Sequence, residues 1–355
     1  MIFPALKPVR FVQNAVQSAL SGIFSKPQMT NFILLLSGII IGQCLNLSYI
    51  EKLLLGRKSD NAFSWFLSHA KLNPDAIWQA ILMFAVQAFH VGPCAGHFIL
   101  GDTIEKHSKF CRFIQGVCTL YDHATGAYVK GECYVFLYFA ISDKIRFPIG
   151  WKIYVPNSKT KYVLALELID EALLKGFHCS YVLVDSWFAI APFLDSLHRK
   201  GLRYTCELKS NNKIWARCDK KSLLEIYSWR WLIEEFFGDE KKLLDFEGAR
   251  MRNYQAEAIT LLTLSCADLL LSLEIFRHSQ VDSQSRTLTF SSMIAKVQEE
   301  NIQTLPEALS SEEKGEGIAI KWLGVLRKES TRYRRQRRML YKLLEEDDFE
   351  NRMTG

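Results

Sequence analysis

The order of short apolar runs in the middle of the chain limits its fold more than any other feature. Three runs rich in aromatic and β-branched residues, at 98–102, 113–121 and 133–141, are separated by polar turns and predict consecutive antiparallel strands. The pattern then alternates between helix and strand, with predicted elements at 161–175, 181–184, 188–200, 203–208 and 222–244. This order, βββ-α-β-α-β-α, predicts an α/β protein in which helices cover a mixed sheet.

Helical patterns flank this central region on both sides. Residues 1–92 contain dense apolar segments and end at Gly92-Pro93, which predicts an N-terminal helical domain and a boundary. The mixed sheet is expected within 93–252. Residues 253–355 begin with a very apolar helical segment and continue into a polar C-terminal helical region with a basic stretch at 327–342. That stretch is expected either to bind phosphates or to form a solvated helix face.

Composition excludes several classes of protein. The chain has 355 residues, of which 49% are hydrophobic and 23% charged, as is typical of a folded soluble protein. Its nine cysteines contain no Cys-x-x-Cys pair, which argues against a zinc ribbon and favours reduced thiols. The net charge of +6 permits a polyanionic partner without requiring one. The N-terminus lacks a signal-peptide pattern, and the apolar run from Phe32 to Leu47 is too short for a membrane span, so we expect a cytoplasmic protein with no membrane partner.

Two aspartates close predicted strands. Asp102 ends the run Leu100-Gly-Asp-Thr103, and Asp185 ends the run Leu183-Val-Asp-Ser186. Polar residues at the ends of neighbouring strands often form sites. Each aspartate alone is more simply explained as a turn former or a helix N-cap, and Asp185 is well placed to cap the next predicted helix. The eight histidines do not cluster in the sequence, and neither His97 nor His107 is assigned to catalysis.

The long predicted helix at 222–244 carries four polar residues at helical spacing. Tyr227, Arg230, Glu234 and Lys241 follow one another at intervals of three, four and seven, so an unbroken helix would place them on one face. One carboxylate beside a hydroxyl and two cations suits nucleic-acid phosphates near a bound metal ion. A solvated face with charge pairs at i, i+4 is the simpler interpretation and is favoured by periodicity alone.

Three carboxylates on two strand ends and one helix could perform phosphoryl transfer. Such a set can hold two divalent cations about 3.5–4 Å apart, an arrangement that activates an attacking water and stabilises the leaving oxygen. Mg²⁺ suits it because that ion binds a few carboxylates while keeping positions for water and phosphate oxygens. Without metal, these carboxylates would repel one another.

The complete pattern resembles the DDE transposases of bacterial insertion sequences, in the insertion sequence four group. The residues Tyr227, Arg230, Glu234 and Lys241 match the YREK signature of that group, and the segments around Asp102-Thr103 and Val184-Asp-Ser186 resemble the surroundings of its first two catalytic aspartates. The strand order is also that of ribonuclease-H-like folds. The resemblance implies a catalytic domain at 93–252, with Asp102, Asp185 and Glu234 as catalytic residues and metal ligands.

The same resemblance implies a function and partners. It implies two Mg²⁺ ions per active site, with Mn²⁺ as a substitute, and DNA contacts from Tyr227, Arg230 and Lys241. It further implies cut-and-paste transposition by a homodimer that binds double-stranded DNA, both terminal inverted repeats and target, in the nucleoid of a bacterium or archaeon. The N-terminal helices are expected to bind the inverted repeats. Competing hypotheses are a domesticated DNA-binding protein, a ribonuclease-H-like nuclease that cleaves without joining, and a structural helical protein.

Two features depart from the family pattern. Many relatives have a second aspartate before the first catalytic one, but this chain has Gly101 there. Only 49 positions separate Asp185 from Glu234, which leaves no room for the large β-domain that some relatives insert there. Trp187 directly follows the second aspartate region and is the best candidate for stacking on a DNA base, although a core or interface aromatic is the more common role for such a residue.

Overall fold

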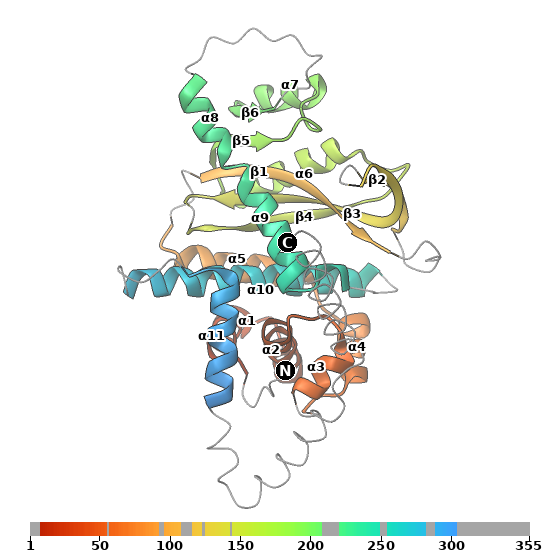
Figure 1. Ribbon diagram of the computed structural model, residues 1–355, viewed down its shortest axis with the longest axis vertical. Helices are drawn as coiled ribbons and strands as arrows, with labels where there is room; N and C mark the ends of the chain where they lie inside the picture. The colour runs from red at the N-terminus through yellow and green to blue at the C-terminus, as the bar shows by residue number, and fades with distance from the viewer. Residues whose placement is uncertain are drawn as a thin grey trace, which may run out of the picture.

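The structure is a computed structural model. It describes residues 8–54, 57–91, 96–107, 116–122, 125–142, 144–207, 220–248, 254–281 and 288–303. A mixed sheet with its covering helices occupies one end of the molecule, and a group of helices occupies the other (Figure 1). Helices α5 (Pro74–Ala88) and α10 (Tyr254–Val281) pack against each other and lie between these two parts (Figure 1).

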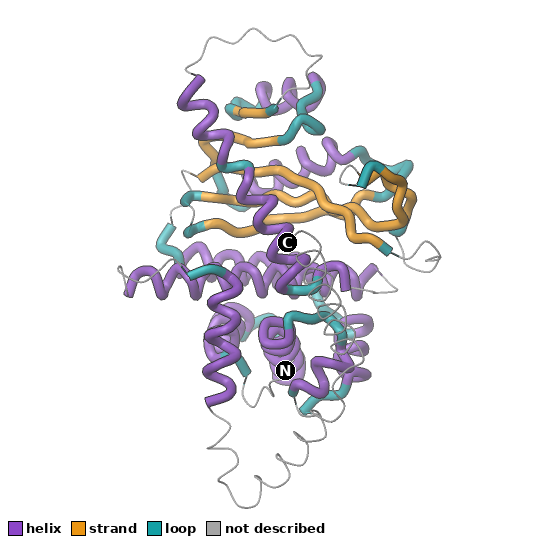
Figure 2. The backbone as a smooth tube through the Cα atoms, in the orientation of Figure 1, coloured by secondary structure: helices purple, strands orange, loops and turns teal. Residues whose placement is uncertain are grey.

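The sheet has the strand order of a ribonuclease-H-like fold. Strand β1 (Gly96–Lys106) lies at its centre, with antiparallel β3 (Ala127–Ala140) on one side and parallel β5 (Cys179–Val184) on the other. Strand β4 (Arg146–Tyr154) extends the antiparallel side, and β6 (Tyr204–Cys206) extends the parallel side. The predicted α/β fold class is therefore confirmed. The colours of Figure 2 show these strands as one layer crossed by helices.

One predicted strand is assigned wrongly. The third long antiparallel strand is β4, which the sequence analysis missed, whereas the predicted strand at 113–121 corresponds only to the short β2 (Cys118–Asp122), which pairs with the start of β3. Strand β4 alternates apolar residues at 147, 149, 151 and 153 with other residues, but two of those others, Pro148 and Gly150, are disfavoured in strands. Pro148 is tolerated because β4 is an edge strand and has a bulge against β3 at this point.

Two helices cover opposite faces of the sheet. Phe136 of β3 contacts Phe236 and Phe237 of α9 (Trp231–Leu243). The next residue, Leu137, faces the other way and pairs with Gly150, whose missing side chain leaves room for Leu168 of α6 (Lys161–Leu174). Because successive side chains of a strand alternate between faces, α9 and α6 lie on opposite sides. We call these the α9 face and the α6 face.

The predicted helix at 222–244 is two helices. Helix α8 (Lys220–Ser228) ends before α9 begins at Trp231. Between them the backbone N–H groups of Trp229 and Arg230 donate to carbonyls three residues earlier, at 3.2 and 2.9 Å, so the chain tightens into a 3₁₀-type turn. The break coincides with a tertiary contact, because the Trp229 indole packs edge-on against His97 of β1.

The other helices form the second part of the molecule, with α7 (Ala191–Arg199) and the short 3₁₀ helix η1 (Phe246–Gly248) remaining beside the sheet. Helix α10 packs against α5 and three further N-terminal helices. By length and composition α10 could cross a membrane, but 83% of its apolar window is buried inside the protein. The remaining helices are α1 (Arg10–Leu20), α2 (Lys26–Gly42), α3 (Leu47–Leu53), α4 (Asp60–His69) and α11 (Phe290–Gln303).

Helix α2 confirms the prediction that the apolar run after Phe32 is a buried helix, since residues 31–41 are all buried. The basic stretch at 327–342 lies outside the described residues. The division of the chain at residues 92 and 252 stays a prediction.

Candidate active site

The two predicted catalytic aspartates lie where the parallel pairing of β1 with β5 ends. Asp185 directly follows the end of β5, as predicted, but the prediction that Asp102 ends a strand is wrong, because β1 continues to Lys106 in its ladder with β3. In the parallel pair of β1 and β5, Ile99 is opposite Leu183, so Asp102 and Asp185 follow this pair by three and two residues. They are close enough to interact electrostatically. Burial raises the pKa of Asp185, and the negative charge of Asp102 raises it further. Folding thus brings together two carboxylates that are 83 positions apart in the sequence.

Asp102 points to the α6 face and is held by a lysine. Its Oδ2 lies 2.6 Å from Nζ of Lys161, the first residue of α6, and only 18% and 16% of these side chains are exposed. Burial acts to lower the pKa of Lys161, but the Asp102 carboxylate and the Cys133 thiol raise it above its ordinary value. Burial also raises the pKa of Cys133 to about 12, so the Asp102 carboxylate is neighboured by one cation and one neutral thiol.

Asp185 also shapes the turn that follows β5. Its Oδ1 accepts hydrogen bonds from the backbone N–H groups of Trp187 at 2.9 Å and Phe188 at 3.3 Å. This is the turn-forming role that the simpler interpretation of the sequence expected. The same turn places the Trp187 ring 5.4 Å from Lys161 Nζ, next to the Asp102 pair. Trp187 is 47% exposed, so it is not a core aromatic.

Glu234 lies in the first turn of α9 and is paired with an arginine. Nη1 of Arg230 lies 2.8 Å from Oε1 of Glu234, and 44% of the Glu234 side chain is exposed. The charges of both Glu234 and Asp185 act on the Arg230 guanidinium, and each raises its pKa against the opposing effect of burial. Arg230 therefore links the helical glutamate to Asp185.

The four signature residues are only partly on one surface. Tyr227 belongs to α8, and its ring lies 5.8 Å from the Arg230 guanidinium. Arg230 and Glu234 form the i, i+4 pair described above. Lys241 instead approaches β1, where its Nζ lies 3.4 Å from the carbonyl oxygen of Ile104. The expectation of one continuous helical face is wrong, because the turn at residues 229 and 230 divides it.

Gly101 allows α9 to lie directly on β1. A Cβ at this position would be 3.0 Å from Cδ1 of Ile233 and 3.1 Å from Cε2 of Phe237. Ile233 directly precedes Glu234, so this close packing fixes the height of the glutamate above the sheet. The departure from the family pattern at Gly101 thus has a packing reason that the sequence alone did not reveal.

A compact group of possible metal ligands lies elsewhere. Among the described residues, Glu105, His107 and Glu132 offer ligand atoms that all lie within 4.8 Å of one another, whereas the three predicted carboxylates form no group this tight. Sequence reasoning missed this group, and its only local signal is the spacing of Glu105 and His107 on one side of a strand. The predicted carboxylates still fit a hard divalent cation by chemistry, since all their ligand atoms are oxygens.

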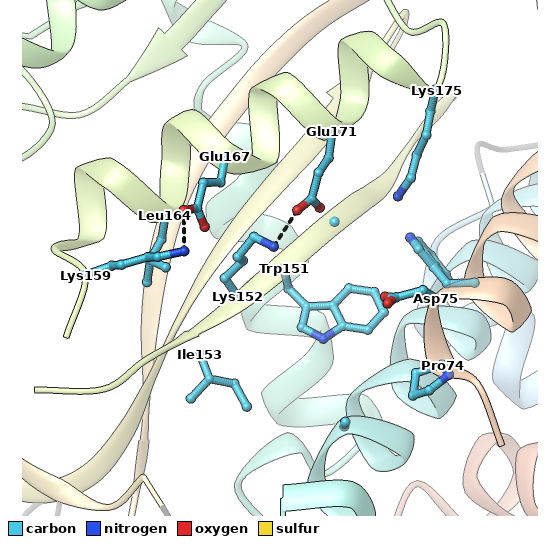
Figure 3. A pocket seen from close by; sticks show the side chains of 13 residues that line it. Pro74, Asp75, Trp151, Lys152, Ile153, Lys159, Leu164, Glu167, Glu171 and Lys175 are labelled. Atoms are coloured by element: carbon cyan, nitrogen blue, oxygen red, sulfur yellow. Dashed lines mark hydrogen bonds and ion pairs between the residues drawn. The ribbon is translucent and has the colours of Figure 1, made fainter. Parts of the chain in front are cut away.

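A cavity of about 540 Å³ lies between α5, β4 and α6 (Figure 3). Figure 3 shows that its polar wall consists largely of ion pairs, between Lys152 and Glu171 and between Lys159 and Glu167. None of the seven predicted site residues lines it. The paired charges and the separate location argue against this cavity as the reaction site.

A family model matches the central region of the sequence. Residues 132–270 match the model described as the transposase DDE domain. The matched segment runs from β3 into α10 and includes Asp185 and Glu234, but it begins after Asp102. The finer assignment to the YREK-signature group stays a prediction.

Comparison with whole proteins gives a similar solved structure. No curated protein matches the sequence. A solved structure of the piggyBac transposase synaptic complex with hairpin DNA is similar at 10% sequence identity and a TM-score of 0.48, over 90% of this chain and 84% of that one.

Proposed function

We propose that this protein is a DNA transposase that cleaves DNA ends and joins them to target DNA by metal-dependent phosphoryl transfer. The observation that carries the proposal is the meeting of Asp102 and Asp185 where the pairing of β1 with β5 ends, with the Arg230–Glu234 pair near Asp185, in a chain whose residues 132–270 match the transposase DDE domain. The reaction needs carboxylates at this edge of the sheet and cations that approach a phosphate from the helix side.

The metal ligands in this proposal are Asp102, Asp185 and Glu234. They would hold Mg²⁺, or Mn²⁺ as a substitute, in a two-ion site; when bound, the ions lower the pKa of the attacking water or hydroxyl and stabilise the leaving oxygen. The chain's own cations support this assignment. Lys161 and Arg230 neutralise two of the three carboxylates, which is the compensation that a metal site needs when it holds no ion.

The DNA contacts come from residues around these carboxylates. Tyr227, Arg230 and Lys241 are proposed to bind the backbone near the transferred end, and Trp187 to stack on a base beside Asp185. The exposure of Trp187 and its position over Lys161 support this role. The substrates would be terminal inverted repeats and target DNA, bound by a homodimer inside a bacterial or archaeal cell.

The test uses the purified full chain with duplexes that carry its own element's ends. Glu234→Gln should abolish Mg²⁺-dependent cleavage and leave binding to the ends intact, because the substitution removes only a charge. Glu235→Gln is the matched control, since the adjacent carboxylate pairs with Arg146 instead. Unchanged cleavage by Glu234→Gln would refute the proposed active site.

A second assay separates transposition from simple hydrolysis. Pre-cut ends with a free 3′-hydroxyl are incubated with supercoiled target DNA and Mg²⁺, and joined products are measured. A transposase joins the ends to the target. Cleavage in the first assay without joining in the second would instead identify a nuclease.

A further inference from the structure

A second group of carboxylates lies on the α9 face of the same central strand. Glu105 of β1 is directly opposite Glu132 of β3 in the antiparallel ladder, and each residue is only 1% exposed. Two like charges directly opposite each other destabilise a sheet, and burial increases that cost. A positive charge between the two strands would offset the repulsion between the Glu105 and Glu132 carboxylates.

The neighbouring side chains converge on these glutamates. Nε2 of His107 lies 3.0 Å from Oε2 of Glu132 and 3.8 Å from Oε1 of Glu105, and only 4% of the His107 side chain is exposed. Glu257 reaches the same place from α10. The hydroxyl of Tyr134 lies 3.3, 3.2 and 2.9 Å from oxygens of Glu105, Glu132 and Glu257. One phenol proton can serve only one of these three carboxylates at a time.

An independent observation points to a ligand. The second oxygen of Glu132, Oε1, is buried and has no hydrogen-bond partner among the described residues. Gly116 lies beside it with φ of 93°, and a Cβ there would be 3.2 Å from this oxygen. A buried carboxylate oxygen without a partner is costly. Because Gly116 has no side chain, the space beside Oε1 of Glu132 stays open, and this oxygen can accept a ligand.

We propose that Glu105, His107 and Glu132 bind a zinc ion. An imidazole among carboxylates favours Zn²⁺ over the hard cation Mg²⁺, which prefers oxygen ligands alone. Ligand atoms around a tetrahedral zinc lie roughly 3.3 Å apart, given bonds of about 2.0 Å, and the His107 distances of 3.0 and 3.8 Å bracket that value. Glu257 lies next to these three ligands, where its carboxylate accepts a hydrogen bond from the Tyr134 hydroxyl.

The ion would join two neighbouring strands. Glu105 and His107 come from β1 and the residue after it, and Glu132 comes from β3. Glu257, in the first turn of α10, contacts the same group through the Tyr134 hydroxyl, so the ion would also hold in place the point where α10 meets the sheet. This inference does not rest on the proposed transposase chemistry, because the group is on the opposite face of β1 from Asp102.

The experiment uses the full chain after treatment with a chelator and gel filtration. Zn²⁺ is added at increasing molar ratio, the bound metal is measured by elemental analysis after a second filtration, and Tm is recorded at each ratio. We expect one retained zinc per chain and a rise in Tm that saturates at one equivalent. Mg²⁺ at the same concentration should not produce this stoichiometric rise.

Variants locate the ion. Glu132→Gln and His107→Gln should each weaken zinc binding by more than about 100-fold, since loss of a ligand exceeds the effect of losing a supporting residue. Glu132→Gln removes a buried negative charge, so the metal-free variant should still fold and show no zinc-dependent Tm. Asp185→Asn and the surface variant Glu171→Gln should bind zinc as the unsubstituted chain does.

Three outcomes would overturn the proposal. The first is a folded, unsubstituted chain that retains no zinc, and the second is full zinc binding by Glu132→Gln. The third is loss of zinc in Asp185→Asn with retention in His107→Gln, which would place the ion at Asp102 and Asp185.

Discussion

The two faces of strand β1 carry carboxylates that are neutralised in different ways. On the α6 face, Asp102 pairs with Lys161, whose long side chain reaches it from the start of a helix. On the α9 face three residues later, Glu105 faces Glu132, with the His107 imidazole and the Tyr134 hydroxyl packed between strands. A lysine side chain can swing away from its partner, whereas a ring held next to a strand cannot. We infer from this comparison that the Asp102 group on the α6 face suits a metal ion that binds and leaves, whereas the Glu105–His107–Glu132 group on the α9 face suits a metal ion that remains bound.

The largest expected effect comes from substituting one carboxylate on each face of β1 and comparing the rates of DNA cleavage. Asp102→Asn should reduce Mg²⁺-dependent DNA cleavage by about 1,000-fold or more, equivalent to about 4 kcal/mol of transition-state stabilisation. Glu105→Gln should leave the cleavage rate within about tenfold of the unsubstituted chain, because its carboxylate faces away from the reacting phosphate. Rates under single-turnover conditions with saturating DNA make the comparison. Equal losses in both variants would show that the two faces do not act separately.

Another pair of buried carboxylates, Glu240 of α9 and Asp268 of α10, belongs to no metal-ligand group among the described residues and is neutralised by a proton instead, which makes its effect on stability depend on pH. Burial, followed by the charge of Asp268, raises the pKa of Glu240 well above its ordinary value. Between the ordinary and the raised pKa, the folded chain holds a proton on Glu240 that the unfolded chain has released, so the contribution of this carboxyl to stability falls as the pH rises above about 4.5. The Glu240→Gln side chain stays neutral at every pH, so the variant should lack this pH dependence. Its free energy of unfolding, relative to that of the unsubstituted chain, should therefore rise with pH by up to about 1.4 kcal/mol per pH unit.

The free energy of unfolding of the Glu240 variant is measured by chemical denaturation between pH 5 and pH 8. This range lies above the ordinary pKa of a glutamate, about 4.5. Glu171→Gln, whose carboxylate pairs with Lys152 near the surface, serves as the control and should run parallel to the unsubstituted chain. If the Glu240→Gln curve is parallel as well, the Glu240 carboxyl does not keep a proton in the folded protein.

A smaller effect is expected where β1 meets α9. Gly101→Val should lower the free energy of unfolding by about 1–3 kcal/mol, because its side chain would meet Ile233 and Phe237 and force the helix away. Gly238→Ala is the matched control, since nothing lies within 4 Å of its added Cβ, and it should stabilise α9 by about 0.5–1 kcal/mol. Thermal unfolding measures both. A stable Gly101→Val variant would mean that the contact is loose.

The sequence predicted the parts of this molecule that depend on local pattern. The runs that became β1, β3 and β5, the position of Asp185 after a strand, and the buried apolar helix after Phe32 follow from periodicity within single segments. Strand β4 was missed because its alternation includes Pro148 and Gly150, two residues that strands disfavour. The break between α8 and α9 was missed because it accompanies a tertiary contact, that of Trp229 with His97.

The Glu105–His107–Glu132 group was out of reach for a different reason. Polar residues at every second position of β1, here Thr103, Glu105 and His107, look like a solvated strand face. They are buried only because β3 adds Glu132 in register and α10 covers that face with Glu257. Register between distant strands and coverage by a distant helix are properties of the folded chain, and no window of the sequence contains them.

The smallest expected effect tests whether a metal ion can replace the Lys161 ammonium group as the partner of Asp102. Lys161→Met keeps most of the side-chain length but removes the charge that neutralises Asp102, so the affinity for Mg²⁺ should increase by about tenfold, or about 1.4 kcal/mol. The Mg²⁺ concentration for half-maximal binding, from titration calorimetry without DNA, gives the result. Lys159→Met removes a lysine two positions away that pairs with Glu167, and it should leave that concentration unchanged. Weaker Mg²⁺ binding by Lys161→Met would show that the ammonium group supports the metal site, and the contrast between an exchanging face and a permanent face of β1 would fail.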